Sequence, residues 1–364
     1  MIAAPTIPTE PINADALGTC PLPHSQYDRI LLGHGSGGTL SNDLIRKVFV
    51  PGFGGDTLAR LEDQATVSIE SMTGGQRLAF TTDSFVVRPI FFPGGDVGKL
   101  AVCGTVNDLA VGGATPLYLS AAFILEEGLP IDDLKRIVTS MRSACAEANI
   151  QLVTGDTKVV DRGKGDQVFI STSGIGVVPA GRNLSIRNAK PGDKIIVSGT
   201  IGDHGIAIMS VREGIEFETV LESDCAPLAD LTRVMLKASP NIRCMRDPTR
   251  GGISSALNEL ADASRVGVRL TESAIPVGRE VRAACEMLGL DVLYVANEGK
   301  LLAVVPPEET DAVLAAMRAH PLGRNAAVIG DVVDDHLGMV ILKTLVRGER
   351  VVTMLNGEQL PRIC

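Results

Sequence analysis

Three short motifs place an aspartate where its carboxylate could bind a metal ion. Thr82-Asp83-Ser84 lies in the apolar, β-branched run 78–87, Asn107-Asp108 lies in an otherwise apolar helical segment, and Gly155-Asp156-Thr157-Lys158 follows a strand pattern. Acidic side chains rarely sit among apolar neighbours without a partner, and Mg²⁺ that bridges nucleotide phosphates takes hard oxygen ligands. A single aspartate is better explained as a cap or as half of an ion pair. The three together favour a metal site formed by Asp83, Asp108 and Asp156.

Two further motifs could bind phosphate. The loop at residues 33–38 (GHGSGG) matches G-x-G-x-x-G, whose glycines let backbone N–H groups approach phosphate at the start of a helix. A phosphate loop at Gly35, Ser36, Gly37 and Gly38 and an ordinary tight turn are equally compatible with this pattern. In the second half, residues 246–252 (RDPTRGG) lead into a predicted helix start, where Arg246-Asp247 could meet a nucleotide.

Four residues could act on a substrate or contact it. Cys364, the last residue of the sequence, follows the turn-prone segment 360–363, and its thiol is either an incidental exposed cysteine or a group that a swinging tail delivers to partners. Glu298 in the turn 296–300 is either solvated or a base. Lys158 is either a surface lysine or a contact to phosphate or substrate. The loop around His204 fits an anion contact and a helix cap about equally well.

The elements that would carry these residues alternate along the chain. Helical patterns cover 96–111 and 131–149, and strand patterns cover 78–87, 117–125, 151–154 and 168–178. A polar stretch at 182–193 then precedes a second series of strands and helices.

This alternation predicts an α/β (α+β) fold with two mixed-sheet domains. We place the first domain at residues 29–181 and the second at 182–346. A flexible leader (1–28) precedes them, and a mobile tail (347–364) follows.

Composition and charge argue against several classes of protein. The net charge of −9 and the 3% aromatic content disfavour nucleic-acid binding, which needs basic surface or stacking side chains. The apolar runs are too short for a membrane span, and the leader lacks the basic and apolar regions of a signal peptide. The seven scattered cysteines include no C-x-x-C pair, so mostly reduced thiols are expected. We expect a cytoplasmic protein without nucleic-acid or membrane partners.

From residue 30 to 364 the sequence resembles the hydrogenase maturation factor HypE family, whose members are carbamoyl dehydratases. This family belongs to the larger group of ATP-binding proteins related to aminoimidazole ribonucleotide synthetase. The resemblance is carried, in order, by GHGSGG (33–38), TTDSFVV (81–87), VTGDTKVV (153–160), GTIGDHG (199–205), RDPTRGG (246–252), NEGK (297–300) and PRIC (361–364).

The resemblance implies two α/β domains, a homodimer formed through the N-terminal sheets, and ATP and Mg²⁺ as cofactors. Asp83, Asp108 and Asp156 match metal or nucleotide positions, and we assign Asn107 to the nucleotide with them. Lys158 and Glu298 match residues at the substrate end. The carbamoyltransferase HypF would load a carboxamide on Cys364, and the HypC–HypD complex would later accept cyanide for the iron of [NiFe] hydrogenase.

On this expectation the carboxamide oxygen attacks the γ-phosphate of ATP. Glu298, with Lys158 positioning or relaying protons, then removes an N–H proton as phosphate leaves, and Cys364 becomes a thiocyanate. Two alternatives remain open. A related ATP-dependent synthetase acting on a small free substrate would not need Cys364, and a non-catalytic ATP-binding scaffold would make no covalent change.

Overall fold

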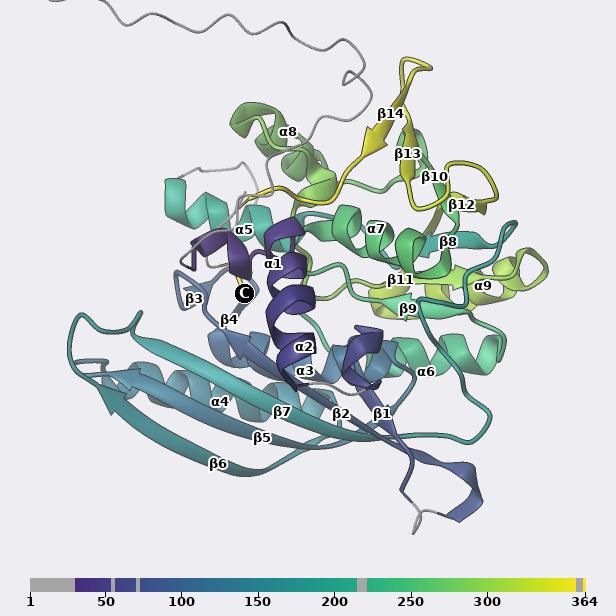
Figure 1. Ribbon diagram of the computed structural model, residues 1–364. Coiled ribbons are helices and arrows are strands. Elements are labelled where there is room, and N and C mark those ends of the chain that lie inside the picture. The colour runs from purple at the N-terminus through teal and green to yellow at the C-terminus, as the bar shows by residue number, and fades with distance from the viewer. Residues whose placement is uncertain (1–29, 54–55, 70–72, 215–220, 358–362) are drawn as a thin grey trace, which may run out of the picture. The chain divides into compact units, whose positions relative to one another are not determined.

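The computed structural model of the protein describes residues 30–364 except 54–55, 70–72, 215–220 and 358–362. From Leu32 onward the chain forms one compact unit. The predicted leader at residues 1–28 lies outside the described residues. The predicted α/β fold with two mixed sheets is confirmed (Figure 1). No helix in the described part of the chain is long and apolar enough to cross a membrane.

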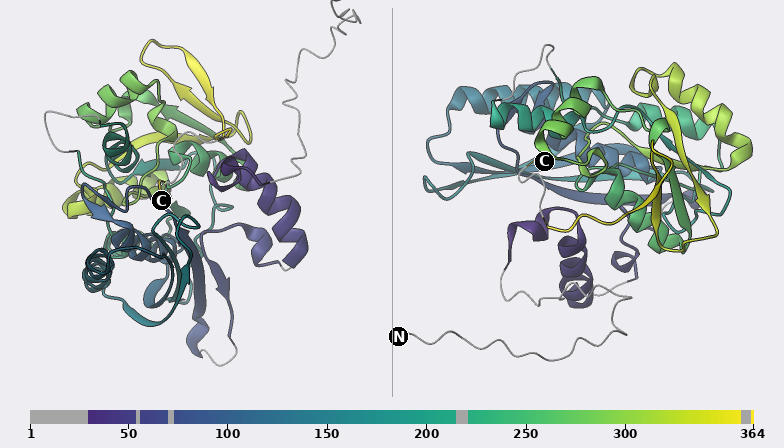
Figure 2. Two further views of the ribbon diagram at one scale, coloured as in Figure 1. Left: turned by 90° about the vertical axis from the view of Figure 1, so that its left-hand side faces the viewer. Right: turned by 90° about the horizontal axis from the view of Figure 1, so that it is seen from above.

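The first sheet has five strands in the order β1-β2-β7-β5-β6, and of its pairs only β5–β6 is parallel. Helices α3 and α4 lie along one face of this sheet (Figure 1 and Figure 2). The elements are β1 (Ala65–Val67), β2 (Arg77–Phe85), α3 (Val97–Val111), β5 (Thr115–Glu126), α4 (Ile131–Glu147), β6 (Gln151–Val160) and β7 (Val168–Val178).

Periodic burial explains how these elements pack. Every second residue of β7, from Val168 to Val178, is buried, as expected for a strand with one covered face. The buried residues of α4 include Ile137, Met141 and Ala144, whose spacing gives the helix one apolar stripe.

Helix α3 is different because it is buried on nearly all sides. Only Lys99 and Asp108 of this helix are not buried. The Asp96 side chain caps its start by accepting hydrogen bonds from the backbone N–H of Gly98 (2.7 Å) and Lys99 (3.0 Å). The helix contacts the first sheet and also α6 and β9 of the second half, so it joins the two halves of the molecule.

The second sheet has seven strands in the order β14-β13-β10-β12-β8-β11-β9, and only β10–β13 is a parallel pair. Its strands are β8 (Lys194–Val197), β9 (Cys244–Arg246), β10 (Gly267–Thr271), β11 (Leu302–Val305), β12 (Ala327–Val333), β13 (Val340–Lys343) and β14 (Glu349–Val352). The helices of this half are α5 (Asp203–Glu213), α6 (Ala229–Ala238), α7 (Gly252–Ser264), α8 (Arg279–Leu288) and α9 (Thr310–Ala319).

Strand β8 shows that helices cover both faces of this sheet. Ile195 and Val197 pack with residues of α7, whereas Ile196, between them, packs with residues of α6 and α9. Because the two faces are both covered, residues 195–197 of the strand are all apolar rather than alternating with polar residues.

The remaining elements are short. They comprise α1 (Thr39–Leu44), a π-helical turn (Ile45–Phe49), α2 (Val50–Phe53), β3 (Phe91–Phe92), β4 (Gly95–Asp96) and the 3₁₀ turns Leu32–Gly35, Leu58–Arg60, Thr73–Gly75, Glu272–Ala274, Val292–Tyr294, Pro307–Glu309 and Pro321–Gly323.

Two elements differ from the sequence predictions. The strand expected at 151–154 continues to Val160, so Asp156 and Lys158 lie within β6 rather than after it. The strand can continue because residue 155 is a glycine. A Cβ at this position would lie 2.5 Å from the backbone oxygen of Ala121 on the neighbouring strand, which is too close. The segment expected to be a mobile tail contains β14, which pairs with β13, and its residues 358–362 lie outside the described part of the chain. The domain boundaries at 29–181, 182–346 and 347–364 stay predictions.

Candidate active site

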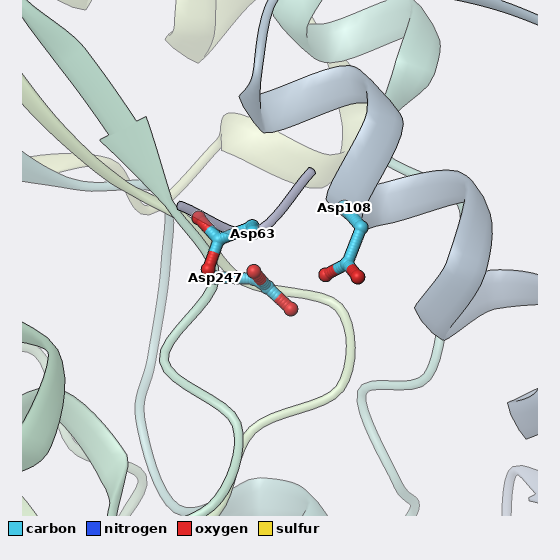
Figure 3. A group of neighbouring side chains, drawn as sticks. All are labelled: Asp63, Asp108 and Asp247. Atoms are coloured by element: carbon cyan, nitrogen blue, oxygen red, sulfur yellow. The ribbon is translucent and has the colours of Figure 1, made fainter. Parts of the chain in front are cut away.

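Three aspartates from distant parts of the chain point toward one another (Figure 3). Asp63 precedes β1, Asp108 lies on α3, and Asp247 follows β9. One carboxylate oxygen from each lies within 4.8 Å of the others. We call these residues the acid cluster.

The acid cluster carries more negative charge than its neighbours balance. Burial raises the pKa of Asp63 to about 6, that of Asp247 to about 7 and that of Asp108 well above its ordinary value. Repulsion from Asp63 and Asp83 adds to the shifts of Asp108 and Asp247, and repulsion from Glu259, Glu62 and Asp83 adds to that of Asp63. Arg246 lies 3.3 Å from Asp63 but also pairs with Glu259. Three oxygen ligands with unbalanced charge are a suitable donor set for a hard divalent cation such as Mg²⁺.

Asp83 borders this cluster. Thr105 of α3 donates a hydrogen bond to its carboxylate (Oγ1 to Oδ2, 3.1 Å), and its carboxyl also contacts Asp108. Burial raises the pKa of Asp83. The structure therefore places the predicted residues Asp83 and Asp108 together.

Asp156 and Lys158 lie elsewhere in the same chain. Asp83 is paired with Thr172, which is buried beneath α3, whereas Asp156 is paired with Ala122 on the exposed face of the sheet. Three strand spacings, about 14 Å, separate β6 from β2. Asp156 and Lys158 are exposed and 3.6 Å apart (Oδ2 to Nζ), so they form a pair on this open face and do not join the acid cluster of their own chain.

The Asn107 side chain is buried and already engaged with the main chain of the second half. Its amide nitrogen donates to the backbone oxygens of Ala226 (3.1 Å) and Glu298 (3.2 Å), and its oxygen accepts from the backbone N–H of Leu228 (2.7 Å). These bonds tie α3 to the segments beside it, and a role for Asn107 at the nucleotide stays a prediction.

Two pockets flank the acid cluster. One of about 240 Å³ is lined by residues that include Asp63. The other, of about 420 Å³, is lined by five arginines and three acidic residues, namely Arg46, Arg60, Arg187, Arg246, Arg265, Glu62, Glu259 and Asp262. The Nη1 atom of Arg246 is buried and has no hydrogen-bond partner among the described residues. Donors of this kind beside a cation site are suited to a polyphosphate.

The glycine loop at residues 33–38 packs against the segment that follows β14. Ser36 donates to the backbone oxygen of Gly357 (2.8 Å), and Arg250 donates to that of Gly35 (3.0 Å). A Cβ on Gly38 would lie 2.1 Å from the backbone oxygen of Leu355. Close approach of the chain to itself therefore explains this glycine, and phosphate binding by Gly35, Ser36, Gly37 and Gly38 stays a prediction.

The final two residues are docked inside the molecule, near β3, β4 and α5 (Figure 1). Ile363 is 5% exposed within the first hydrophobic core and forms an antiparallel bridge with Val87. The backbone N–H of Val86 donates to the backbone oxygen of Cys364 (3.1 Å). Cys364 packs against the same core.

This docking brings the Cys364 thiol to the Glu298 carboxyl, with which it forms a hydrogen bond. Burial and the negative charge of Glu298 raise the pKa of the thiol to about 12, and Arg250 opposes part of this shift. Burial also raises the pKa of Glu298 well above its ordinary value, and nearby Cys225 and Asp224 add to it. The docked tail thus brings the two predicted groups, the Cys364 thiol and the Glu298 carboxyl, into contact.

A tight loop holds Glu298 in place. Its backbone N–H donates to Asp224 (2.9 Å), and Lys300 pairs with Asp224 at 3.2 Å. A Cβ on Gly299 would lie 1.8 Å from the backbone oxygen of Asp224, so only glycine fits there. Oε1 of Glu298 is buried without a hydrogen-bond partner among the described residues, which leaves it able to accept a proton.

Asp63 and Arg250 are two residues of the site that were not predicted from the sequence. Asp63 belongs to no motif, and its only signal is that it lies two residues before a short β-branched strand. Arg250 lies in the RDPTRGG motif, where its charge at a helix start was the available signal.

Comparison with known proteins gives a consistent result. Residues 61–178 match the N-terminal domain, and residues 190–343 the C-terminal domain, of the AIR synthase related proteins. A carbamoyl dehydratase HypE from Cupriavidus necator is 55% identical over 336 residues, covering 92% of this chain and 95% of that protein.

Solved structures agree. A chain in a crystal structure of a HypE–HypF complex is 47% identical with a TM-score of 0.80, covering 86% of this chain and 99% of its own length. The structure of a HypE protein in complex with ATP is 46% identical with a TM-score of 0.77, covering 92% and 100%.

Proposed function

The chain belongs to the HypE family of carbamoyl dehydratases, and from that premise we propose that Cys364 carries the carboxamide that this enzyme dehydrates to a thiocyanate with ATP. The observation that carries the proposal is the docked Cys364 thiol against the Glu298 carboxyl, with Arg250 and Asp83 close by. The thiocyanate supplies the cyanide ligand of hydrogenase iron.

The reaction requires that an amide lose water, and phosphorylation makes its oxygen a leaving group. The carboxamide oxygen attacks the γ-phosphorus, the bond from this phosphorus to ADP breaks, and one N–H proton is lost. The C–O bond then breaks, phosphate departs, the second N–H proton is removed, and the C≡N bond is complete. Glu298 accepts this second proton, because its raised pKa makes its carboxylate a stronger base than an ordinary glutamate.

The residues around the acid cluster would hold the nucleotide. Mg²⁺, which neutralises charge on phosphate oxygens when bound, would be held by Asp63, Asp108 and Asp247 with Asp83 beside them. Arg246 and the arginines of the neighbouring pocket would contact the phosphates. ATP binding by this chain is supported by the relative solved with ATP.

The carboxamide would be loaded while the Cys364 thiol is in a different position, outside this site. With a pKa of about 12, the docked thiol is a poor nucleophile at neutral pH. Cys364 would therefore leave the site to be loaded by a carbamoyltransferase of the HypF type, the partner of one solved relative. It would leave again to pass cyanide to a HypC–HypD complex in the cytoplasm.

The open face of the first sheet supports a homodimer. Phe80, Tyr118 and Ile124 are 44%, 46% and 43% exposed on this face, an unusual position for large apolar side chains unless a partner covers them. A second copy packed there would also cover Asp156 and Lys158. Asp156 and Lys158 would then contact the nucleotide or substrate of the second copy, across the interface.

Peptide mass spectrometry tests the proposal. The protein is incubated with the carbamoyltransferase, carbamoyl phosphate and Mg-ATP, beside a Cys364→Ala variant. We expect the peptide that contains Cys364 to gain a carboxamide and then lose water only as ATP is hydrolysed. If ATP turns over while Cys364 stays unmodified, a synthetase acting on a free substrate replaces this proposal.

A further inference from the structure

His204 lies in the first turn of α5, and its imidazole is fully buried. Its Nε2 is 2.7 Å from the backbone oxygen of Ile363, and its Nδ1 is 2.8 Å from Oγ of Ser223. The imidazole packs edge to face with the Phe92 ring, with 5.6 Å between the ring centroids and 88° between the ring planes. The dehydration mechanism uses none of these contacts directly.

The hydrogen-bond partners fix which nitrogen carries the proton. Burial holds the pKa of His204 below its ordinary value, so the ring is neutral. The Ile363 carbonyl can only accept, so Nε2–H donates to it and Nδ1 must accept from the Ser223 hydroxyl. Oγ of Ser223 in turn accepts from the backbone N–H of Cys225 (3.1 Å). The chain of donors therefore runs in one direction and ends on Ile363.

We propose that His204 is a positioning residue that anchors the Ile363–Cys364 peptide and so holds the reacting sulfur at Glu298. This inference rests on the proposed role of Cys364. The peptide unit is planar, so a fixed Ile363 carbonyl also fixes the direction in which the Cys364 Cα lies. On the other side of the Cys364 Cα, the Val86 N–H donates a hydrogen bond to the Cys364 backbone oxygen. Few torsions then remain to place the sulfur and any group on it.

The anchor also biases the tail toward the docked position. When Ile363 leaves, the Nε2–H of His204 loses its acceptor in a buried environment, and an unpaired buried donor is unfavourable. Departure of the tail thus removes a hydrogen bond as well as apolar contacts of Ile363. Dehydration and transfer would be separated by this release step.

Thiol labelling of the free protein tests the anchor without ATP or partner proteins. Iodoacetamide is added at mildly alkaline pH, and peptide mass spectrometry follows each cysteine separately. The matched variants are His204→Gln, whose amide nitrogen can replace Nε2, and His204→Asn, which reaches only the Nδ1 position. In His204→Asn we expect Cys364 to be alkylated about tenfold faster, which corresponds to about 1.4 kcal/mol. His204→Gln should stay close to the unaltered protein.

Cys244 and Cys285 serve as internal controls because they are 2% and 5% exposed and lie in other core clusters than Ile363. Unchanged labelling of Cys364 in His204→Asn would overturn the proposal, and so would equal acceleration in both variants. Acceleration that extends to Cys244 and Cys285 would mean that His204 supports the whole fold rather than the tail, and it would also overturn the proposal. Since labelling needs no carbamoyl transfer, its result stands apart from the fate of the dehydratase proposal.

Discussion

Glu298→Gln is the most informative substitution at the proposed site. Glutamine keeps the size and neutral charge that the buried Glu298 side chain has when protonated, but it cannot take a proton from the substrate. A positioned general base contributes about 10²- to 10⁴-fold to rate, so dehydration should slow by that factor, which is about 3–5 kcal/mol of barrier. Loading of the carboxamide, which takes place away from this site, should stay unchanged.

The assay is single-turnover peptide mass spectrometry on protein already loaded with carboxamide. After Mg-ATP is added, the ratio of thiocyanate to carboxamide on the Cys364 peptide gives the rate of dehydration. Slow dehydration with normal loading supports the base. Dehydration at the unaltered rate in Glu298→Gln would refute the reasoning and move proton removal to another group, with Lys158 the next candidate.

The same variant has a consequence for stability. The folded protein holds the Glu298 proton more tightly than the unfolded chain does, because burial raises the pKa above its ordinary 4.5. This carboxyl therefore favours the folded state most below pH 4.5, and the contribution is lost as pH rises toward the folded pKa. Glu298→Gln should match the unaltered protein in acid and become relatively more stable as pH rises, as measured by urea unfolding.

Three further predictions concern the cluster, the interface and the loop. Asp247→Asn removes a carboxyl whose pKa is raised from 3.8 to about 7. Without metal, the unfolding free energy of this variant should therefore rise above that of the unaltered protein by up to about 4 kcal/mol between pH 4 and 7. Mg²⁺ should raise the melting temperature less in this variant, and equal rises would exclude Asp247 as a ligand. Ile124→Asp should give monomers in light scattering, whereas Val138→Asp, at a 50% exposed site on α4, should leave the dimer intact; dimers in both would contradict the proposed interface. Gly299→Ala should lower the unfolding free energy by about 1–3 kcal/mol and slow dehydration, since its Cβ would lie 1.8 Å from Asp224. Gly278→Ala, with no contact nearer than 3.7 Å, is its control, and similar rates in the two would argue against a role of the loop.

Local sequence patterns were sufficient to predict the fold class and part of the candidate site. Asp108 stood out because it interrupts an apolar helix, and the helix is indeed buried apart from Lys99 and Asp108. The pairing of Cys364 with Glu298 came from family motifs, since no periodicity relates two residues so far apart in the chain.

The other residues depend on packing that the sequence does not display. In the sequence, Gly155 indicates a turn, yet it lies within β6. Glycine is present there because the backbone of the neighbouring Ala121 leaves no room for a side chain. That difference moves Asp156 to the open face of the sheet. Asp63 joins the acid cluster because Gln64 next to it donates to the Gly112 carbonyl at the end of α3 and Arg246 of β9 pairs with Asp63, contacts that no local motif encodes.

The central position of α3 has a consequence for biosynthesis. Residues 97–111 leave the ribosome long before α6 and β9, which cover part of the helix. Until residue 246 has been made, the nascent chain displays an apolar helix with part of its packing surface uncovered, a state that attracts chaperones and favours aggregation. The two sheets should therefore reach their final fold together, after synthesis of most of the chain, rather than one after the other.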